Sequence, residues 1–327
     1  MPDPRPSPAG GQTAAIDVLM VGPLLPALAD QVRQRYRAHH WWEAADPARL
    51  LAEHGERIRA IVTTARFGAT RALIESLPRL EVIVSFGVGL DPIDMDAARE
   101  RGIVVTNTPG VLEDCVADTA MSLVLSVSRR ICELDRFVRS GGWRAATPPL
   151  GRRLAGRCCG ILGLGSIGLK IARRAEAFGM EVAYHNRRPR QDAPAHYRYC
   201  PDLPTLAAHS AFLVLAVPGS AQTHRLVGAA ILDALGPDGV LINVARGSVV
   251  DEAALVDALR DGRLGGAGLD VYQNEPEVPA ALCAMDNVVL LPHVGGSTVE
   301  TRQAMAQLFM RNLDGWFERR QPATPVT

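Results

Sequence analysis

The sequence has no long apolar run, no excess of one charge and no cysteines at a metal-binding spacing. Its 327 residues balance 35 Lys and Arg against 35 Asp and Glu, so no general field attracts nucleic acid or an anionic membrane. No apolar run reaches the ~18–20 residues that a membrane-spanning helix requires. We therefore expect no nucleic-acid partner and no membrane association.

The six cysteines include no CxxC motif and no other spacing typical of a metal site. We expect no bound metal, and reduced, mostly buried thiols such as a cytosolic protein contains. The first residues, MPDPRPSPAGGQ, lack the apolar core of a signal peptide. Their proline and glycine content predicts a disordered tail over residues 1–14, and the expected location of the protein is cytoplasmic.

What the sequence does contain is an alternation of short β-branched runs with helix-forming segments. The runs predict strands at 17–21, 60–63, 82–85 and 104–106, and then at 159–162, 182–185, 212–217, 240–243, 266–270 and 288–291. Such alternation is typical of parallel sheets covered by helices on both faces. Its two sets predict an α/β chain of two doubly wound domains. One long helix is expected between them at 113–141, and another at 298–320.

The segment CCGILGLGSIGLKIA combines a strand, a glycine turn and a helix. Gly163, Gly165 and Gly168 hold the three positions of GxGxxG. The first glycine permits the tight turn, the second lets the backbone approach a pyrophosphate, and the third lets the helix pack on the strand. The helix N-terminus then faces the anion. This pattern predicts a dinucleotide site, with a glycine-rich corner that binds nothing as the alternative.

The next strand ends without the acidic residue that an NAD site offers to the ribose 2′-hydroxyl. It leads into Asn186, Arg187 and Arg188, with Arg190 nearby, and no carboxylate occurs before Asp192. Arginine suits the oxygens of a 2′-phosphate, which a carboxylate would repel. We expect NADP(H) as the preferred cofactor and NAD(H) as a secondary one. The alternative is a solvated basic loop.

Three polar side chains follow expected strands in otherwise apolar surroundings. Arg246 lies in GVLINVARGSVVDEAAL, Glu275 in GAGLDVYQNEPEVP and His293 in NVVLLPHVGGST. Ligands of an open α/β sheet bind beyond the carboxyl ends of its strands. Reduction of a 2-keto acid needs a proton donor and a cation that binds the carboxylate of the substrate. A histidine whose pKa is raised by a neighbouring protein carboxylate suits the first role, and an arginine suits the second. Each residue alone could instead be structural.

These blocks, together with SFGVGLDPIDMDAARERGIVVTNTPGVLEDCVADTA and GILGLGSIG, make the chain resemble the D-isomer-specific 2-hydroxyacid dehydrogenase family over nearly its whole length. It is most similar to the glyoxylate/hydroxypyruvate reductase branch, whose enzymes use NADPH. The resemblance implies two Rossmann-like domains. A flavodoxin-like substrate domain would be split between 15–111 and 293–327, a dinucleotide domain would span 112–292, and the substrate would lie in the cleft between them. Most members of the family are homodimers.

The resemblance also implies functional roles for individual residues. Arg246, Glu275 and His293 would be the catalytic set, and the backbone N–H groups of Val88 and Gly89 would bind the substrate carboxylate. Trp143 in RSGGWR matches a loop that reaches a partner subunit's active site in relatives; the alternative is an exposed tryptophan on its own domain. The implied cofactor contacts are Gly163, Gly165, Ser166, Ile167, Gly168, Asn186, Arg187, Arg188, Val217, Pro218, Thr223, Val244, Ala245, Arg246, Asp270, His293 and Gly295.

The expected reaction is NADPH-dependent reduction of small 2-keto acids such as glyoxylate and hydroxypyruvate, with His293 as the proton donor. A relative acting on an aromatic 2-keto acid or on phosphoglycerate would share these motifs, although phosphoglycerate calls for more basic residues near the substrate turn than Arg66. Formate enzymes resemble the family but carry glutamine where Glu275 stands. A dinucleotide-sensing, corepressor-like binding protein could keep the catalytic set, but would be expected to add longer partner-binding extensions.

Overall fold

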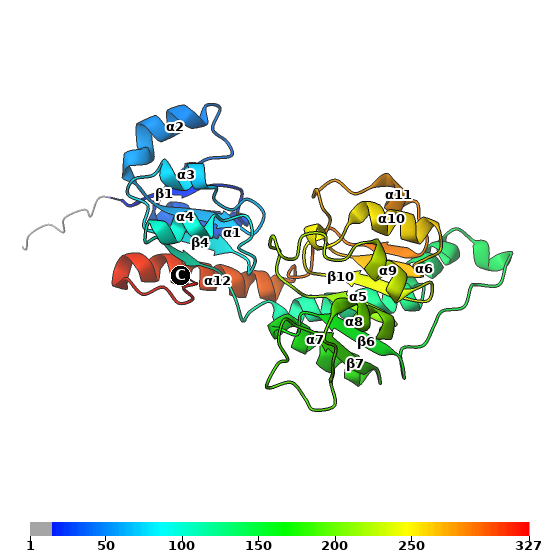
Figure 1. Ribbon diagram of the computed structural model, residues 1–327. Coiled ribbons are helices and arrows are strands. Elements are labelled where there is room, and N and C mark those ends of the chain that lie inside the picture. Colours follow the sequence, from blue (N-terminus) through cyan, green and yellow to red (C-terminus); the bar gives the residue numbers. More distant parts are fainter. Residues whose placement is uncertain (1–14, 327) are drawn as a thin grey trace, which may run out of the picture. The chain divides into compact units, whose positions relative to one another are not determined.

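The computed structural model describes residues 15–326 (Figure 1), so the disordered tail expected at 1–14 lies outside the described residues. The chain divides into two compact units. The first unit comprises 15–109 and 303–326, and the second unit comprises Gly110–Arg302. The chain returns to the first unit later than the expected residue 293, because the N–H of His293 donates to the carbonyl of Asp270 and ties the intervening loop to the second unit.

The sheet of the first unit is entirely parallel, in the order β2-β1-β3-β4-β5. This order is typical of flavodoxin-like folds, with a switch point between β1 and β3. Edge strand β2 was not predicted, because its sequence RAHH has no apolar run. The elements are β1 (Asp17–Met20), α1 (Pro26–Arg35), β2 (Arg37–His40), α2 (Pro47–His54), η1 (Gly55–Arg57), β3 (Ile58–Thr64), α3 (Arg71–Glu75), β4 (Val82–Phe86), α4 (Met95–Glu100), β5 (Val104–Thr106) and α12 (Val299–Arg319), which begins in the second unit.

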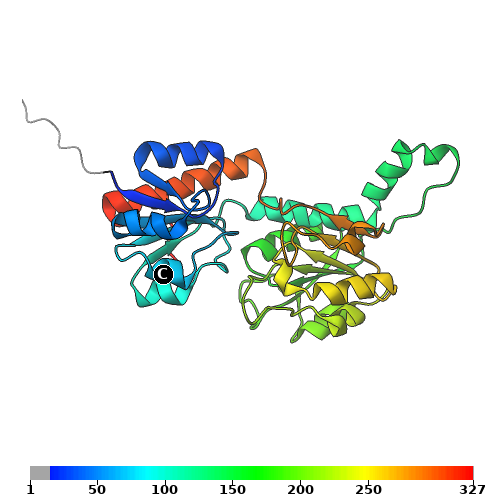
Figure 2. The same ribbon diagram turned by 90° about the horizontal axis from the view of Figure 1, so that it is seen from above.

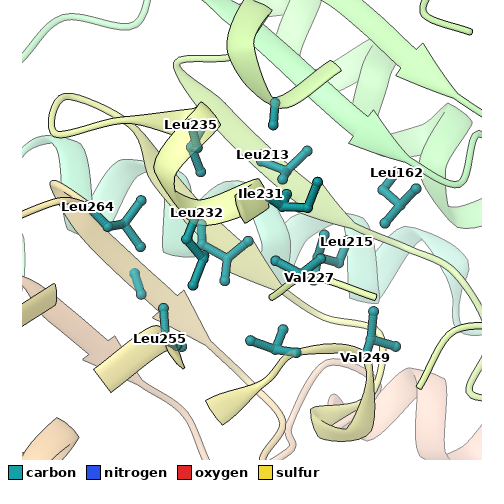
Figure 3. Close-up of a cluster of buried hydrophobic side chains, with 14 of the residues drawn as sticks. Leu162, Leu213, Leu215, Val227, Ile231, Leu232, Leu235, Val249, Leu255 and Leu264 are labelled. Atoms are coloured by element: carbon teal, nitrogen blue, oxygen red, sulfur yellow. The ribbon is translucent and has the colours of Figure 1, made fainter. Parts of the chain in front are cut away.

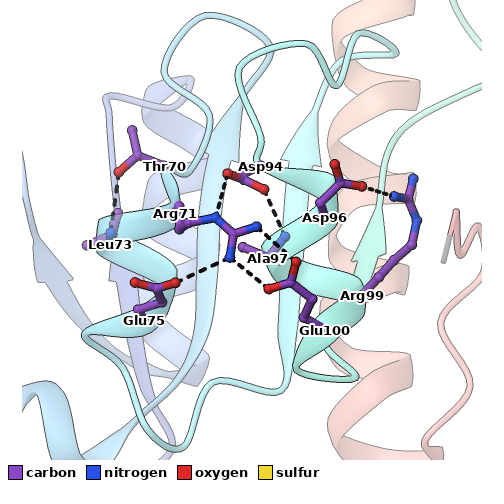
Figure 4. Close-up of polar contacts among 9 residues, drawn as sticks. All are labelled: Thr70, Arg71, Leu73, Glu75, Asp94, Asp96, Ala97, Arg99 and Glu100. Atoms are coloured by element: carbon purple, nitrogen blue, oxygen red, sulfur yellow. Dashed lines mark hydrogen bonds and ion pairs between the residues drawn. The ribbon is translucent and has the colours of Figure 1, made fainter.

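Helices α3 and α4 lie side by side and are joined by polar contacts (Figure 4). Arg71 donates to the two carboxylate oxygens of Glu100 at 2.7 and 3.1 Å. Asp94 caps α4 by accepting the N–H of Ala97 at 2.8 Å. Exposed ion pairs of this kind stabilise a fold only weakly, whereas an N-cap contributes about 1 kcal/mol. Beneath them, Ile61, Ile83 and their neighbours form an apolar core on the sheet.

The second unit has a parallel seven-stranded sheet in the order β12-β11-β10-β9-β6-β7-β8. From β6 the chain adds strands β7 and β8 on one side and strands β9 to β12 on the other side of the sheet. The switch point therefore lies between β6 and β9, which is where Rossmann folds bind nucleotides. The elements are α5 (Glu113–Ser128), α6 (Ile131–Arg139), η2 (Gly142–Arg144), β6 (Cys158–Leu162), α7 (Ser166–Ala177), β7 (Glu181–His185), β8 (Arg198–Tyr199), α8 (Leu203–His209), β9 (Phe212–Leu215), α9 (Ala229–Leu235), β10 (Val240–Asn243), η3 (Gly247–Val249), α10 (Glu252–Arg260), β11 (Gly266–Leu269), α11 (Ala280–Cys283) and β12 (Val288–Leu290).

A leucine-rich core fixes the strands that carry the site (Figure 3). Leu213 and Leu215 of β9 are fully buried, and Leu232 of α9 and Leu255 of α10 pack against the same face. Each such side chain contributes about 1.5–3 kcal/mol when it is buried. The ends of β9 and β10 are therefore rigid supports for the loops that follow them.

The prediction of a single helix at 113–141 is wrong. Helix α5 ends at Ser128 and α6 begins at Ile131, because Arg130 adopts a left-handed conformation with φ of 54°. No glycine or proline marks this break in the sequence, so helix propensity alone predicted a continuous element. The segment with α6 and η2 stands away from the sheet of the second unit (Figures 1 and 2), and α6 contains no buried residue.

The expectation of mostly buried thiols is also wrong. Only Cys159 and Cys200 are buried, Cys283 is exposed, and all six cysteines are free. None of the helices in the part of the chain that the structure describes has the length and hydropathy needed to cross a bilayer.

Candidate active site

The glycine turn lies between β6 and α7, and each glycine has a distinct structural reason. Gly163 has φ of +98°, and a Cβ at this position would lie 2.7 Å from Cγ1 of Val217. A Cβ at Gly168 would lie 2.1 Å from the carbonyl oxygen of Gly163. At Gly165 such a Cβ would meet no atom of residues 15–326 within 4 Å, apart from those of the glycine and its chain neighbours. The protein's own packing therefore requires the first and third glycines, whereas the second leaves space that a ligand can enter.

The first turn of α7 supplies hydrogen-bond donors to this space. The helix begins at Ser166, and its first intrahelical bond runs from the N–H of Leu169 to the carbonyl of Gly165 at 2.9 Å. The N–H groups of Ser166, Ile167 and Gly168 precede that bond and have no partner in the helix. With the positive end of the helix dipole, they fit the pyrophosphate of a dinucleotide.

Asn186 and Arg190 shape the glycine turn from the end of β7. The side-chain oxygen of Asn186 accepts the N–H of Leu164 at 2.7 Å. Arg190 donates to the carbonyl of Leu164 at 2.9 Å and to both carboxylate oxygens of Asp192 at 2.6 and 2.8 Å. Arg190 is therefore already occupied by protein groups, and Asp192 is neutralised by it.

Arg187 and Arg188 are different from Arg190. Both are exposed, and neither side chain forms a hydrogen bond or an ion pair within residues 15–326. They follow β7 at the position where an NAD site would carry its acidic residue. Two guanidinium groups are thus free to bind an anion there.

The loop after β9 lies against the glycine turn. Val217 is the residue that a Cβ at Gly163 would strike. Farther along, the hydroxyl of Thr223 donates to the carbonyl of Pro218 at 2.8 Å and closes the loop. The structure therefore brings Val217, Pro218 and Thr223 to the same edge of the sheet as the glycine turn.

Arg246 follows β10 in a turn that Asn243 organises. Asn243 is 1 % exposed, donates to the carbonyl of Arg246 at 2.9 Å and accepts the N–H of Ala245 at 3.0 Å. Val244 and Ala245 are buried. A Cβ at Gly247 would lie 1.9 Å from the carbonyl carbon of Tyr272. The Arg246 turn is therefore packed directly on the loop that leads to the predicted acid.

His293 and Glu275 form a hydrogen-bonded pair, with Nδ1 of the histidine 2.7 Å from Oε2 of the glutamate. The other oxygen of Glu275 accepts the N–H of Tyr272 at 3.1 Å. Burial acts to raise the pKa of Glu275, but His293, the Tyr272 N–H and the charge of Arg246 outweigh it and hold this pKa below its usual range. Glu275 is therefore a carboxylate at neutral pH that orients the imidazole.

Asp270 holds the loop that presents His293. Its two oxygens accept the N–H groups of Val294 and Gly295 at 2.7 and 2.8 Å. His293 adopts φ of 55°, which is uncommon for a residue with a side chain. Burial, offset only partly by the two N–H groups, raises the pKa of Asp270. Asp270 was expected beside the cofactor; what the structure shows is that its carboxylate fixes the loop that presents His293.

The expected substrate residues Val88 and Gly89 belong to the first unit and follow β4. Gly87, just before them, has φ of +137°. Arg66, on the neighbouring loop, is exposed and lies over the ring of Phe67 at 5.6 Å. Trp143 lies on η2 in the second unit and is 69 % exposed, so most of its surface is not covered by its own domain.

A family model described as D-isomer specific 2-hydroxyacid dehydrogenase, NAD binding domain, matches residues 121–295. The chain is 47 % identical over 312 residues to glyoxylate/hydroxypyruvate reductase A of Arabidopsis thaliana, covering 95 % of this chain and 99 % of the relative. The chain belongs to the D-isomer-specific 2-hydroxyacid dehydrogenase family. The predicted family, fold class and enzyme class are thereby confirmed.

Other relatives of this 2-hydroxyacid dehydrogenase are named for different substrates. It is 46 % identical to hydroxyphenylpyruvate reductase of Plectranthus scutellarioides, over 95 % of this chain and 99 % of the relative. It is 43 % identical to 2-ketogluconate reductase of Gluconobacter oxydans, over 95 % and 98 %. A solved structure of NADPH-dependent glyoxylate/hydroxypyruvate reductase from Sinorhizobium meliloti, in complex with NADP and malonate, matches with a TM-score of 0.90 and 44 % identity, over 96 % and 97 % of the two chains.

Some supporting residues of the dehydrogenase were not identified from the sequence. Asn243 and Tyr272 shape the Arg246 and Glu275 loops, and Asn107 supports the turn of the first unit. An asparagine at the end of a strand is a signal for a side-chain-closed turn, and it could have indicated Asn243. Nothing local marks Tyr272, because its role depends on packing between two loops.

Proposed function

We propose that this dehydrogenase reduces small 2-keto acids, glyoxylate and hydroxypyruvate among them, with NADPH as the hydride donor. The observation that carries the proposal is the 2.7 Å contact between His293 and Glu275, with the charge of Arg246 acting on the same carboxylate. A proton donor with its orienting acid and a cation are the groups that reduction of a keto acid requires.

The chemistry follows from these groups. When bound, NADPH would supply the hydride that the carbonyl carbon requires. His293 donates a proton to the carbonyl oxygen, so that the ketone gains one hydride and one proton and becomes an alcohol. Glu275 holds the imidazole through Nδ1, which leaves Nε2 for the substrate. Arg246 stabilises the negative charge that develops on the carbonyl oxygen and clamps the substrate carboxylate, and the N–H groups of Val88 and Gly89 bind the same carboxylate.

The residues present fit NADPH as the cofactor. The glycine turn and the first turn of α7 would hold the pyrophosphate, and the free Arg187 and Arg188 would bind the 2′-phosphate. Support comes from the name of the solved relative, which is NADPH-dependent and was crystallised with NADP. The other contacts that we propose are Asn186, Val217, Pro218 and Thr223 toward the adenosine, and Val244, Ala245, Asp270 and Gly295 toward the nicotinamide.

We also propose that the enzyme is a homodimer in the cytoplasm. Four apolar side chains on α6 and the following segment are exposed: Ile131 by 48 %, Val138 by 55 %, Trp143 by 69 % and Leu150 by 91 %. A cluster of this kind on a segment that stands off the domain favours contact with a second copy. Six free cysteines agree with a reducing compartment.

Initial rates with NADPH and NADH against glyoxylate, hydroxypyruvate, pyruvate, hydroxyphenylpyruvate and 2-ketogluconate test the proposal. We expect the smallest acids to give the highest kcat/KM, and NADPH to exceed NADH by about tenfold or more, because each charge-assisted contact to the phosphate adds about 1.4 kcal/mol or more. Equal or better rates with NADH would show that the cofactor is misassigned. Absence of turnover with every acid would favour a dinucleotide-sensing binding protein.

A further inference from the structure

Three backbone groups of the turn after β4 are paired within the chain: both groups of Gly87 and the carbonyl of Val88. Gly87 donates its N–H to the hydroxyl of Thr108 at 3.1 Å and accepts the N–H of Thr108 at 2.9 Å. The carbonyl of Val88 accepts the side-chain amide of Asn107 at 3.0 Å. Within residues 15–326 the N–H groups of Val88 and Gly89 donate to no acceptor. Of the three N–H groups of residues 87–89, the two proposed to bind the substrate carboxylate are thus the ones that find no acceptor in the described chain.

Asn107 is itself held from the far end of the sequence. Its carbonyl accepts the side-chain amide of Asn312 at 3.0 Å and the hydroxyl of Thr324 at 2.6 Å. Asn312 is 0 % exposed and Asn107 is 8 % exposed. The side-chain oxygen of Asn312 accepts the N–H of Thr324 at 2.9 Å, and its amide also donates to the Thr324 hydroxyl at 2.8 Å. A connected, buried polar network therefore runs from Thr324 to the turn.

The segment that carries Thr324 is fixed by backbone contacts as well. Residues Thr106 and Pro325 form an antiparallel bridge beside β5, and the N–H of Val326 donates to the carbonyl of Val105 at 2.8 Å. Helix α12, which carries Asn312, and this segment thus meet Asn107 from two directions. Each partner limits the movement of Asn107, and Asn107 limits the movement of Val88.

We propose that Asn107, Asn312 and Thr324 are positioning residues that hold the Val88–Gly89 turn in the conformation that binds the substrate carboxylate. The proposal rests on the proposed function of that turn. Two backbone N–H groups bind an anion well only when both point at it, because neither can follow the ligand as a flexible side chain does. The network keeps this geometry without contacting the substrate.

Thr324 offers the cleanest test, since two substitutions separate its hydroxyl from its volume. Thr324→Val removes the donor to Asn107 and keeps the shape, whereas Thr324→Ser keeps the donor. With glyoxylate and NADPH we expect the KM for glyoxylate to rise roughly tenfold in Thr324→Val, with kcat nearly unchanged and full recovery in Thr324→Ser. The Kd for NADPH should stay within about twofold in both variants, because the network touches only substrate binding.

Asn312→Ala should have the larger effect on KM, and Gln307→Ala, an exposed position on the same helix, should have none. Hydrogen exchange of the peptide that contains Val88 and Gly89 should accelerate in Asn312→Ala and Thr324→Val and not in Gln307→Ala. If Asn312→Ala fails to fold, the comparison of Thr324→Val with Thr324→Ser tests the proposal on its own.

The proposed function and this inference fail in different measurements. Absence of glyoxylate reduction in the unaltered enzyme contradicts the proposed function. The inference is overturned if the unaltered enzyme is active while Thr324→Val is folded and has an unchanged KM. It is equally overturned if Thr324→Ser is as impaired as Thr324→Val, or if the loss appears in kcat or in NADPH binding rather than in KM.

Discussion

The two sheets of the molecule end in glycine turns that present free N–H groups, but they achieve this in different ways. In the second unit the turn runs straight into the twelve-residue helix α7, and the helix itself leaves its first N–H groups unpaired. In the first unit the turn after Phe86 is followed by a loop, and α4 begins only at Met95. Its free donors depend on Thr108 and Asn107, and Asn107 depends on residues of α12 and beyond. In the second unit the free donors thus belong to the helix that follows the turn, whereas the turn of the first unit, which we propose to bind substrate, is held by side chains distant in sequence.

The comparison predicts that changes in the second unit's loops proposed to be catalytic alter kcat, whereas changes around the first unit's turn alter KM. The largest effect should come from His293→Ala, which removes the proposed proton donor. We expect a loss of roughly 10²–10⁴-fold in kcat with the Kd for NADPH nearly unchanged. Steady-state rates and a fluorescence titration with NADPH measure both quantities, and His209→Ala, an exposed histidine of the same unit, is the control. Collapse of NADPH binding would make His293 structural.

Arg246→Ala should follow, with a loss of roughly a hundredfold or more in kcat/KM for glyoxylate, because the cation that stabilises the developing oxyanion is removed. Arg246→Lys should recover only part of this loss, since an ammonium group cannot reproduce the bidentate clamp. Near-normal turnover in Arg246→Ala would mean that another cation has this role.

A double substitution of Arg187 and Arg188 by alanine should change cofactor choice rather than chemistry. We expect the kcat/KM for NADPH to fall about tenfold or more while that for NADH stays the same, because only NADPH carries the 2′-phosphate. Arg173→Ala, an exposed arginine on α7, is the control. An equal fall with both cofactors would assign the two arginines to the fold of the loop.

The smallest effect concerns stability and its dependence on pH. The pKa of Glu275 is lower in the folded state, so its contribution is present above its ordinary pKa of about 4.3 and is lost as the pH falls through the folded pKa. At pH 7 we expect Glu275→Gln to be less stable by about 1 kcal/mol, because the pair with His293 is partly exposed. Urea denaturation should show this difference shrinking as the pH falls below about 4. A stability difference between the unaltered enzyme and Glu275→Gln that grows at low pH would contradict the lowered pKa of Glu275.

The sequence predicted the parts of the fold and of the site that depend on neighbouring residues. All strands except the edge strands β2 and β8, the roles of Gly163 and Gly168, and the positions of Arg246, Glu275 and His293 after strands follow from local patterns. The break at Arg130 escaped prediction because its left-handed conformation has no glycine or proline signal. The contact from Asn312 to Asn107 joins residues 205 positions apart, and only tertiary packing brings them together.

Arg190 shows the same limit within a single loop. In sequence it is one of three arginines that could each bind a 2′-phosphate. The structure separates them, because Arg190 is paired with Asp192 and donates to the turn, while Arg187 and Arg188 keep their donors. Composition identifies a basic loop, but the partners of each guanidinium decide which ones can bind a ligand.

A crystal structure of this protein with NADP⁺ bound would test the central claim most directly, because the nucleotide must connect three features of the second unit. The pyrophosphate should contact the N–H groups at the start of α7, the 2′-phosphate should contact Arg187 or Arg188, and the nicotinamide should lie beside His293 and Glu275. A nicotinamide placed away from the His293–Glu275 pair, or a 2′-phosphate without an arginine partner, would contradict the account.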